Sequence, residues 1–120
     1  MFDPSSFLQL AKKLILNGDE ASLRSAVSRA YYAVFLTARQ RLEALGRTDS
    51  RNRGFPTHNF VWSELENQPL WSQIGQDGRR LHGARKNADY GDHVPNPAKF
   101  ALQYLTLAER LLSQDLIRVK

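Results

Sequence analysis

The sequence predicts an all-α protein, an antiparallel up-and-down bundle of four main helices plus a short extra helix. Three observations support this fold class. Apolar residues recur with the period of an α-helix along most of the chain. Capping residues, glycines and prolines stand between these periodic stretches, where helices would begin and end. No stretch shows the apolar–polar alternation of a β-strand. With 120 residues, of which 42% are hydrophobic, residues 1–120 are expected to form a single helical domain.

The first two predicted helices have clear ends. The first is expected from Pro4 to Asn17, because Asp3 can cap it, proline favours the first helical position and Gly18 favours a stop. The second begins after Asp19 and continues for about seven turns to Gly46. One apolar stripe runs its whole length and consists of Leu23, Val27, Ala30, Val34, Ala38, Leu42 and Leu45.

The next segments alternate breaks with helices. Residues 47–56 lose the helical period and carry three arginines, which predicts an exposed basic loop. Thr57 can cap a short third helix that reaches Asn67, and the break at Pro69 separates it from a fourth helix over residues 71–90. Three glycines should weaken the fourth helix by up to about 1 kcal/mol each relative to alanine. They are Gly75, Gly78 and Gly83.

The last helix is predicted to begin at Asn96 and Pro97 and to end near Leu116. Its apolar side includes Phe100 and Tyr104. The connections between the main helices are short, and short connections place consecutive helices antiparallel.

Composition excludes several classes of protein. Cysteine is absent, which excludes disulfides, thiol catalysis and cysteine-bound zinc or iron–sulfur clusters. No apolar run approaches the roughly 18 residues of a membrane span, and the N-terminus lacks the basic region of a signal peptide, so a cytoplasmic protein without membrane contact is expected. The net charge of +5 at pH 7 favours an anionic partner such as RNA, DNA or an acidic protein surface. A moderate excess of interspersed charges is equally typical of general solubility.

Arg85 is the residue that the helical pattern does not explain. It falls on or beside the apolar stripe of the fourth helix, between Leu81 and Ala88. A guanidinium keeps its charge there, so it needs a carboxylate, a polar cleft or a subunit interface. Asp89 and Asp92 are the nearest carboxylates in sequence. Arg85 therefore forms an ion pair with Asp89 on the helix surface, or it is displayed in a cleft that binds phosphate.

Positive charge concentrates around Arg85, along the fourth helix and the loop after it. A group of this kind suits phosphate binding, although it is also typical of a solvated helix face. We expect His82 at the surface of the helix and His93 in the loop before a proline. The residues predicted to contact phosphate are Arg79, Arg80, His82, Lys86 and His93.

No other catalytic or metal-binding motif is present. There is no glycine-rich phosphate loop, no Gly-x-Ser-x-Gly elbow and no spaced Ser/His/Asp set. His58, Trp62 and Glu66 share one face of the third helix, but tryptophan is not a metal ligand. Neither a metal nor a cofactor is therefore expected. An ion pair with a carboxylate of the fourth helix would satisfy the charge of Arg29. The aromatic residues that follow it are expected to lie in the core or an interface, namely Tyr31, Tyr32 and Phe35.

Two segments resemble those of a known family. The residues Ser28-Arg29-Ala30-Tyr31-Tyr32-Ala33 are similar to the Ser-Arg-Ala-Tyr-Tyr-Ala segment of HEPN-domain proteins. Arg85-Lys86-Asn87-Ala88-Asp89-Tyr90 is similar to the Arg-x-x-Ala-Asp-Tyr signature of the same family. Thr57-His58 opens the third helix where those proteins often have Ser-His or Thr-His. The resemblance extends from about Ser6 to Leu116 and implies the helical-bundle fold.

The resemblance also implies a site and a dimer. Many HEPN proteins are metal-independent ribonucleases, in which two subunits each contribute an arginine with a histidine four to six residues further on. It implies Arg85, Asn87, Asp89 and Tyr90 as catalytic candidates and a homodimer as the assembly. This chain departs from the pattern, because Tyr90 stands where a histidine is expected and His93 follows Arg85 only after seven intervening residues.

That departure affects proton transfer. A histidine with a pKa near 6.5 exchanges protons at neutral pH, whereas a tyrosine with a pKa near 10 is a poor base. His82 or His93, from the same or a partner subunit, is a candidate for the missing proton carrier.

Three functions follow from these patterns. The first is a HEPN-like toxin or defence-type accessory module that acts with a nucleotidyltransferase-like protein partner, because many short HEPN chains are encoded beside one, and that has a phosphate site around Arg85. The second is a metal-independent endoribonuclease that uses Arg85 with another proton carrier. The third is a non-catalytic adaptor that binds RNA or a nucleotide through its phosphates.

Overall fold

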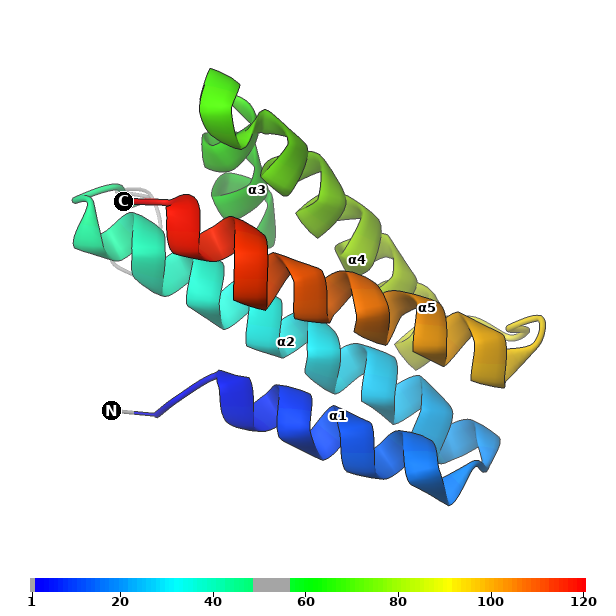
Figure 1. Ribbon diagram of the computed structural model, residues 1–120. Helices are drawn as coiled ribbons and strands as arrows, with labels where there is room; N and C mark the ends of the chain where they lie inside the picture. Colours follow the sequence, from blue (N-terminus) through cyan, green and yellow to red (C-terminus); the bar gives the residue numbers. More distant parts are fainter. Residues whose placement is uncertain (1, 49–56) are drawn as a thin grey trace.

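The computed structural model describes residues 2–48 and 57–120, and the regular structure within these ranges is helical throughout (Figure 1). The predicted all-α class is therefore confirmed. Part of the predicted basic loop, residues 49–56, lies outside the described residues. The elements are α1 (Ser5–Asn17), α2 (Glu20–Ala44), α3 (His58–Glu66), the 3₁₀ turn η2 (Pro69–Trp71), α4 (Ser72–Tyr90) and α5 (Pro97–Arg110).

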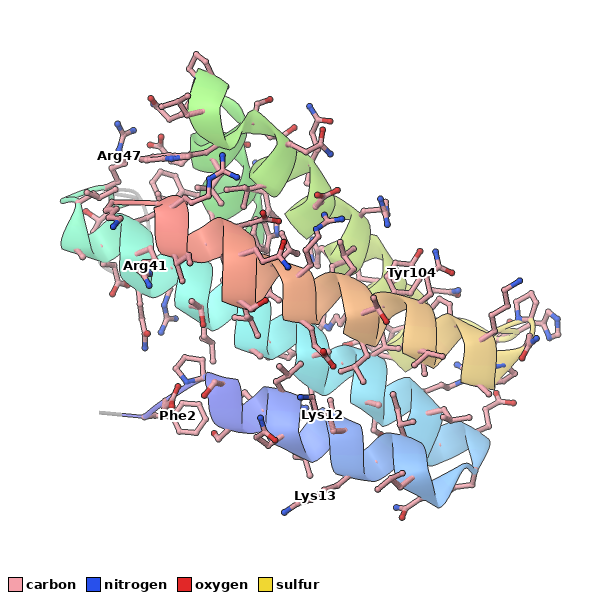
Figure 2. All side chains as sticks on the ribbon, viewed as in Figure 1. Phe2, Lys12, Lys13, Arg41, Arg47 and Tyr104 are labelled. Carbon is pink, nitrogen blue, oxygen red and sulfur yellow. The ribbon has the colours of Figure 1, made fainter. Side chains whose placement is uncertain are left out.

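Helix α2 lies at the centre of the bundle and packs against α1, α4 and α5 (Figure 1). The chain reverses direction at each step from α1 to α2, α4 and α5, while the short α3 lies against α4. Charged side chains cover the outside, among them Lys13 on α1 and Arg41 on α2 (Figure 2). None of the helices in the described ranges has the length and apolarity needed to cross a bilayer.

Side-chain caps begin three helices, and the sequence predicts two of them, Asp19 and Thr57. Asp19 accepts from the Ser22 amide at 3.0 Å before α2, and Thr57 Oγ1 accepts from the amide three residues on at 3.2 Å before α3. Asn96 Oδ1 accepts from the Lys99 amide at 3.3 Å before α5. Helix α1 begins at Ser5, one residue later than predicted, because Pro4 occupies its N-cap position.

The C-terminal segment differs from the single α-helix that the sequence predicts. After Arg110 the chain forms a π-helical turn, η3 (Leu111–Asp115), and then a 3₁₀ turn, η4 (Leu116–Arg118). In an α-helix, residues five apart point about 140° away from each other. The wider π turn allows both Leu111 and Leu116 to be fully buried.

Two glycines of α4 allow a close approach of α3, a role that the sequence does not reveal. Trp62 of α3 is fully buried, and a Cβ atom at Gly78 would overlap its indole ring. A Cβ at Gly75 would overlap Glu66 and the backbone of Trp62. Gly83, in contrast, faces open space. The expected weakening of α4 therefore applies most directly to Gly83.

These glycines give a matched pair of substitutions. Gly78→Ala should lower the free energy of unfolding by about 1–3 kcal/mol, because Trp62 has to move away from the new methyl group. Gly83→Ala should raise it by up to about 1 kcal/mol, because alanine favours the helix and meets no neighbour. Urea denaturation followed by circular dichroism measures both values. A change of the same sign in both variants would contradict the proposed packing role of Gly78.

Candidate functional site between α2, α3 and α4

Polar side chains one helical turn apart join α2 to α4. Ser28 Oγ donates to Asp89 Oδ2 at 3.2 Å, and Arg85 Nη2 donates to Tyr32 Oη at 2.7 Å. Ser28 and Tyr32 are four residues apart on α2, as are Arg85 and Asp89 on α4. Because residues four apart lie on one helix face, the two pairs match each other across the antiparallel helices.

Arg24 extends this row by another turn. Its Nη1 atom donates to the backbone oxygens of Ala88 at 3.2 Å and of Gly91 at 2.6 Å. These carbonyl groups lie at the C-terminal end of α4, where a cation is favoured by the helix dipole. Arg24 therefore fixes the end of α4 that carries Arg85 and Asp89.

Arg85 is held at the edge of the core and is not directed into bulk water. Its side chain is 16% exposed, and its Nε atom lies 3.0 Å from Asp89 Oδ2. The predicted ion pair with Asp89 is thus confirmed, whereas Asp92 forms no ion pair within the described residues. The Nε atom is shielded from solvent and makes no hydrogen bond among the described residues. The guanidinium also lies over the rings of Tyr32, at 5.2 Å, and Tyr90, at 5.9 Å.

Two histidines stack beside this arginine. The rings of His58 and His82 lie 4.7 Å apart and nearly parallel, and the ring of Tyr31 stacks on His82 at 5.1 Å. Phe35 stacks on the other neighbour, His58, at 4.1 Å. His58 is the first residue of α3 and His82 lies on α4, the two helices between which Trp62 packs against Gly78. We call His58, His82 and Tyr31 the imidazole stack.

Hydrogen bonds fix the protons of the imidazole stack. Trp62 Nε1 donates to Tyr31 Oη at 3.2 Å, and Tyr31 Oη lies 2.5 Å from His58 Nδ1. With Trp62 donating to its oxygen, the Tyr31 hydroxyl is assigned as the donor to Nδ1 of His58, the arrangement that uses its own proton. Neutral His58 then carries its proton on Nε2. Neither hydrogen bond involves the nitrogens of His82.

Burial keeps both imidazoles neutral. It lowers the pKa of His82 from 6.5 to about 4, and the nearby His58, Lys86, Arg85 and Arg79 act in the same direction. Burial also lowers the pKa of His58, aided by the charges of Arg85 and Lys86. Burial raises the pKa of the Tyr31 phenol, so this hydroxyl keeps its proton at neutral pH. A positive guanidinium therefore stands beside two uncharged imidazoles.

The other predicted phosphate ligands are distributed over several surfaces. Arg79 is engaged by Glu66 and by Ser63 of α3. Arg80 lies on a different face of α4 and pairs with Asp77 at 3.7 Å. Lys86 is exposed beside the stack, whereas His93 is exposed in the loop after α4.

The four predicted catalytic residues do not all lie together. Arg85 and Asp89 come together, while Asn87 is exposed and Tyr90 is 76% exposed with its ring near Arg85. Two side chains lie otherwise than the sequence suggests. His82 is half-buried, with its ring stacked on His58 and Tyr31, and is not an ordinary solvated residue of the helix surface. Arg29 forms no ion pair within the described residues and instead lies over the rings of Phe7 and Tyr32.

Sequence reasoning missed the roles of Ser28, Tyr32 and His58. A signal was available for the first two, because their four-residue spacing places both hydroxyls on one face of α2. His82 also precedes Arg85 by three residues, which places both on one face of α4. No comparable local signal exists for His58, since its position depends on how α3 packs.

The arrangement combines an anion-binding group with a proton acceptor. A guanidinium has five N–H donors, of which the observed contacts use only part, and it suits the oxygens of a phosphate. His82 is neutral at pH 7 and has the lone pair of a proton acceptor, and its lowered pKa makes it a weak base in the unbound protein. Over residues 2–48 and 57–120, the structure contains no group of three His, Asp or Glu side chains placed to hold a metal ion.

The lowered pKa of His82 predicts how stability depends on pH. Between about pH 6.5 and about pH 4 the unfolded chain binds a proton on this imidazole that the folded chain does not. The free energy of unfolding should therefore fall as the pH decreases through this range. His82→Gln should make the fall shallower, while His93→Gln, at the exposed loop histidine, should leave it unchanged. Urea denaturation at a series of pH values tests this, and an identical slope in His82→Gln and the parent chain would contradict it.

The two sequence segments Ser28–Ala33 and Arg85–Tyr90 thus lie face to face and supply most of the site. The contacts between the two segments are the Ser28–Asp89 and Tyr32–Arg85 hydrogen bonds. Comparison of the chain with protein-family models, with curated proteins and with solved structures found no match.

Proposed function

We propose that this chain is a HEPN-like module that binds a phosphodiester of RNA at Arg85 and cleaves it without a metal ion. The proposal rests chiefly on one observation, the imidazole of His82 stacked on His58 and held three residues before Arg85 on the same face of α4. The HEPN-like segments around Ser28 and Arg85 support the same reading, because they form the two sides of this site.

Arg85 would bind the phosphate. Its contacts with Tyr32 and Asp89 orient the guanidinium and leave other N–H groups for an oxyanion. Asp89 is itself partly exposed, so an incoming phosphate can share the guanidinium with it. Charge-assisted bonds of this type are about twice as strong as neutral ones.

His82 would accept the proton. In RNA cleavage the 2′-oxygen attacks the adjacent phosphorus, the 2′-hydroxyl proton passes to His82, and the bond from phosphorus to the 5′-oxygen breaks. The departing 5′-oxygen takes a proton from water, which leaves a 2′,3′-cyclic phosphate and a 5′-hydroxyl. His58 would position His82 by stacking on it. This assignment replaces the histidine that the family pattern expects at Tyr90 with one that precedes the arginine.

Cleavage of single-stranded RNA tests the proposal directly. In EDTA the chain should cut RNA to products with 2′,3′-cyclic ends, and His82→Gln should slow the reaction by about 10²- to 10⁴-fold, the usual contribution of a proton-transfer group. Arg85→Gln should also abolish cleavage, because the phosphate loses its partner. Arg41→Gln, on α2 (Figure 2), is the matched control and should retain the activity of the parent chain.

The outcomes separate the alternatives. Intact RNA across neutral pH would defeat the ribonuclease proposal. RNA that is bound through Arg85 but not cut would favour the non-catalytic adaptor or the accessory module beside a nucleotidyltransferase-like partner. If RNA binding is unchanged both in Arg85→Gln and at high salt, Arg85 does not bind phosphate, and all three proposed functions lose their phosphate site.

We propose in addition that the module is a homodimer. Tyr90 supports this, because it is a large aromatic side chain, 76% exposed, beside the guanidinium of Arg85. Sedimentation at high micromolar concentration should give the mass of a dimer, and Tyr90→Ser should shift the equilibrium towards monomer. A monomer of the parent chain at that concentration would refute the dimer.

A further inference from the structure

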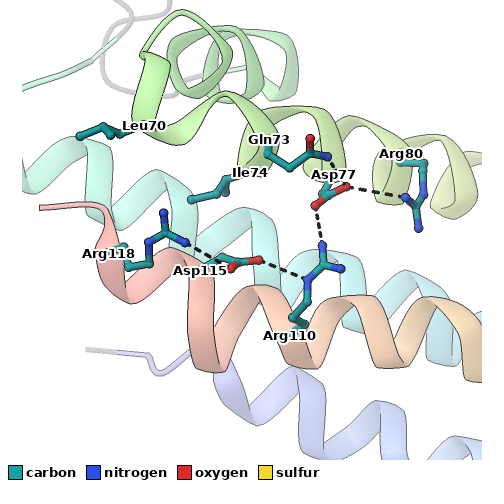
Figure 3. Close-up of a pocket in the computed structure, with 8 residues that line it drawn as sticks. All are labelled: Leu70, Gln73, Ile74, Asp77, Arg80, Arg110, Asp115 and Arg118. Carbon is teal, nitrogen blue, oxygen red and sulfur yellow. Dashed lines mark hydrogen bonds and ion pairs between the residues drawn. The ribbon is translucent and has the colours of Figure 1, made fainter.

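A pocket lies on another flank of α4, between this helix and the C-terminal segment (Figure 3). Its volume is about 360 Å³, at the lower end of the range for small-molecule sites. Three arginines, two aspartates, a glutamine and two apolar side chains line it. We call it the C-terminal pocket. None of the residues of the imidazole stack belongs to its lining.

Asp77 anchors the C-terminal pocket. Its side chain is 5% exposed, and its Oδ2 atom accepts from Arg110 Nη2 at 2.5 Å. The Oδ1 atom accepts from Gln73 Nε2 at 3.2 Å. The protein thus uses both oxygens of this carboxylate, so Asp77 positions Arg110 and is not free to bind a cation.

The π-helical turn η3 supplies the second carboxylate. Asp115 Oδ2 lies 3.3 Å from Arg110 Nε, although the two residues are five apart in sequence. An α-helix brings together residues three or four apart. The π turn therefore brings Asp115 next to Arg110, and such turns occur frequently at functional sites.

The other two arginines have donors to spare. Arg80 lies 3.7 Å from Asp77 and Arg118 lies 3.9 Å from Asp115, and neither forms a hydrogen bond within the described parts of the chain. Their side chains are 56% and 62% exposed. Three guanidinium groups face two carboxylates, which leaves one unit of positive charge in the pocket.

The remaining wall is apolar. Ile74 is buried, and Leu70 beside it is 80% exposed at the rim. Figure 3 shows Leu70 and Ile74 on the side of the pocket near Arg118. A ligand with an anionic group and an apolar or ring-shaped part would fit both sides of the pocket. Its phosphate oxygens would bind the guanidinium groups, and its apolar part would cover Leu70 and exclude water from it.

We propose that the C-terminal pocket binds a small phosphate monoester. The phosphate would take the unused N–H groups of Arg80, Arg110 and Arg118, and the organic part would lie against Leu70 and Ile74. The inference does not depend on the function proposed for Arg85, since the two sites share no residue.

Calorimetric titration of the full chain with AMP, inorganic phosphate and adenosine tests this site. AMP should bind saturably, and the double variant Arg80→Gln, Arg118→Gln should weaken binding by about 10-fold or more, since two charge-assisted contacts are lost. Both substituted side chains are more than half exposed, so the fold should persist, which circular dichroism verifies. Arg118→Glu, near the C-terminus, provides an independent second variant with the same expected loss. Arg41→Gln is the control and should bind as the parent chain does.

Each outcome supports or overturns the site. Binding of AMP more tightly than inorganic phosphate supports the monoester proposal, and equal affinities overturn it, because the organic part would then make no contact with Leu70 and Ile74. The proposal is overturned if neither phosphate probe binds saturably or if adenosine binds as tightly as AMP. It is also overturned if the double variant retains full affinity, or if Arg85→Gln abolishes binding while the double variant does not.

Discussion

The close packing of Trp62 against Gly78 determines where the groups of the candidate active site lie. Because Gly78 has no side chain, α3 approaches α4 closely enough to bury the indole completely. The indole then donates to Tyr31, and Tyr31 donates to His58. His82 can stack on His58 only because α3 and α4 are held at this separation. One contact between an indole and a glycine thus fixes a network that reaches three helices.

The fold was largely predictable because its signals are local. Asp19 and Thr57 cap their helices as expected, and caps depend only on residues a few positions away. The π turn after Arg110 was not predictable from the same signals. It allows Leu111 and Leu116 to be buried together, and their burial depends on the shape of the core rather than on the helical period.

The candidate site was predictable only in part. The Arg85–Asp89 pair lies within one helix, and its spacing predicts it. Tyr32 and Ser28 contact that pair through the register of α2 against α4, which no local pattern specifies. His82 was assigned to the surface because a polar residue beside an apolar stripe usually faces solvent. In the structure, the ring of His58 from α3 covers one face of the His82 ring, so His82 is only partly exposed.

Arg85 acts on His82 through its charge as well as through its position. In the unbound protein this charge helps to hold the pKa of His82 well below that of a free histidine. In the proposed complex a phosphate would neutralise the guanidinium, and its own negative charge would favour the protonated imidazole. The pKa of His82 would therefore rise when the substrate binds, so that the imidazole becomes a stronger base when a 2′-hydroxyl is beside it. The guanidinium of Arg85 would thus bind the phosphate, and the bound phosphate would raise the proton affinity of His82.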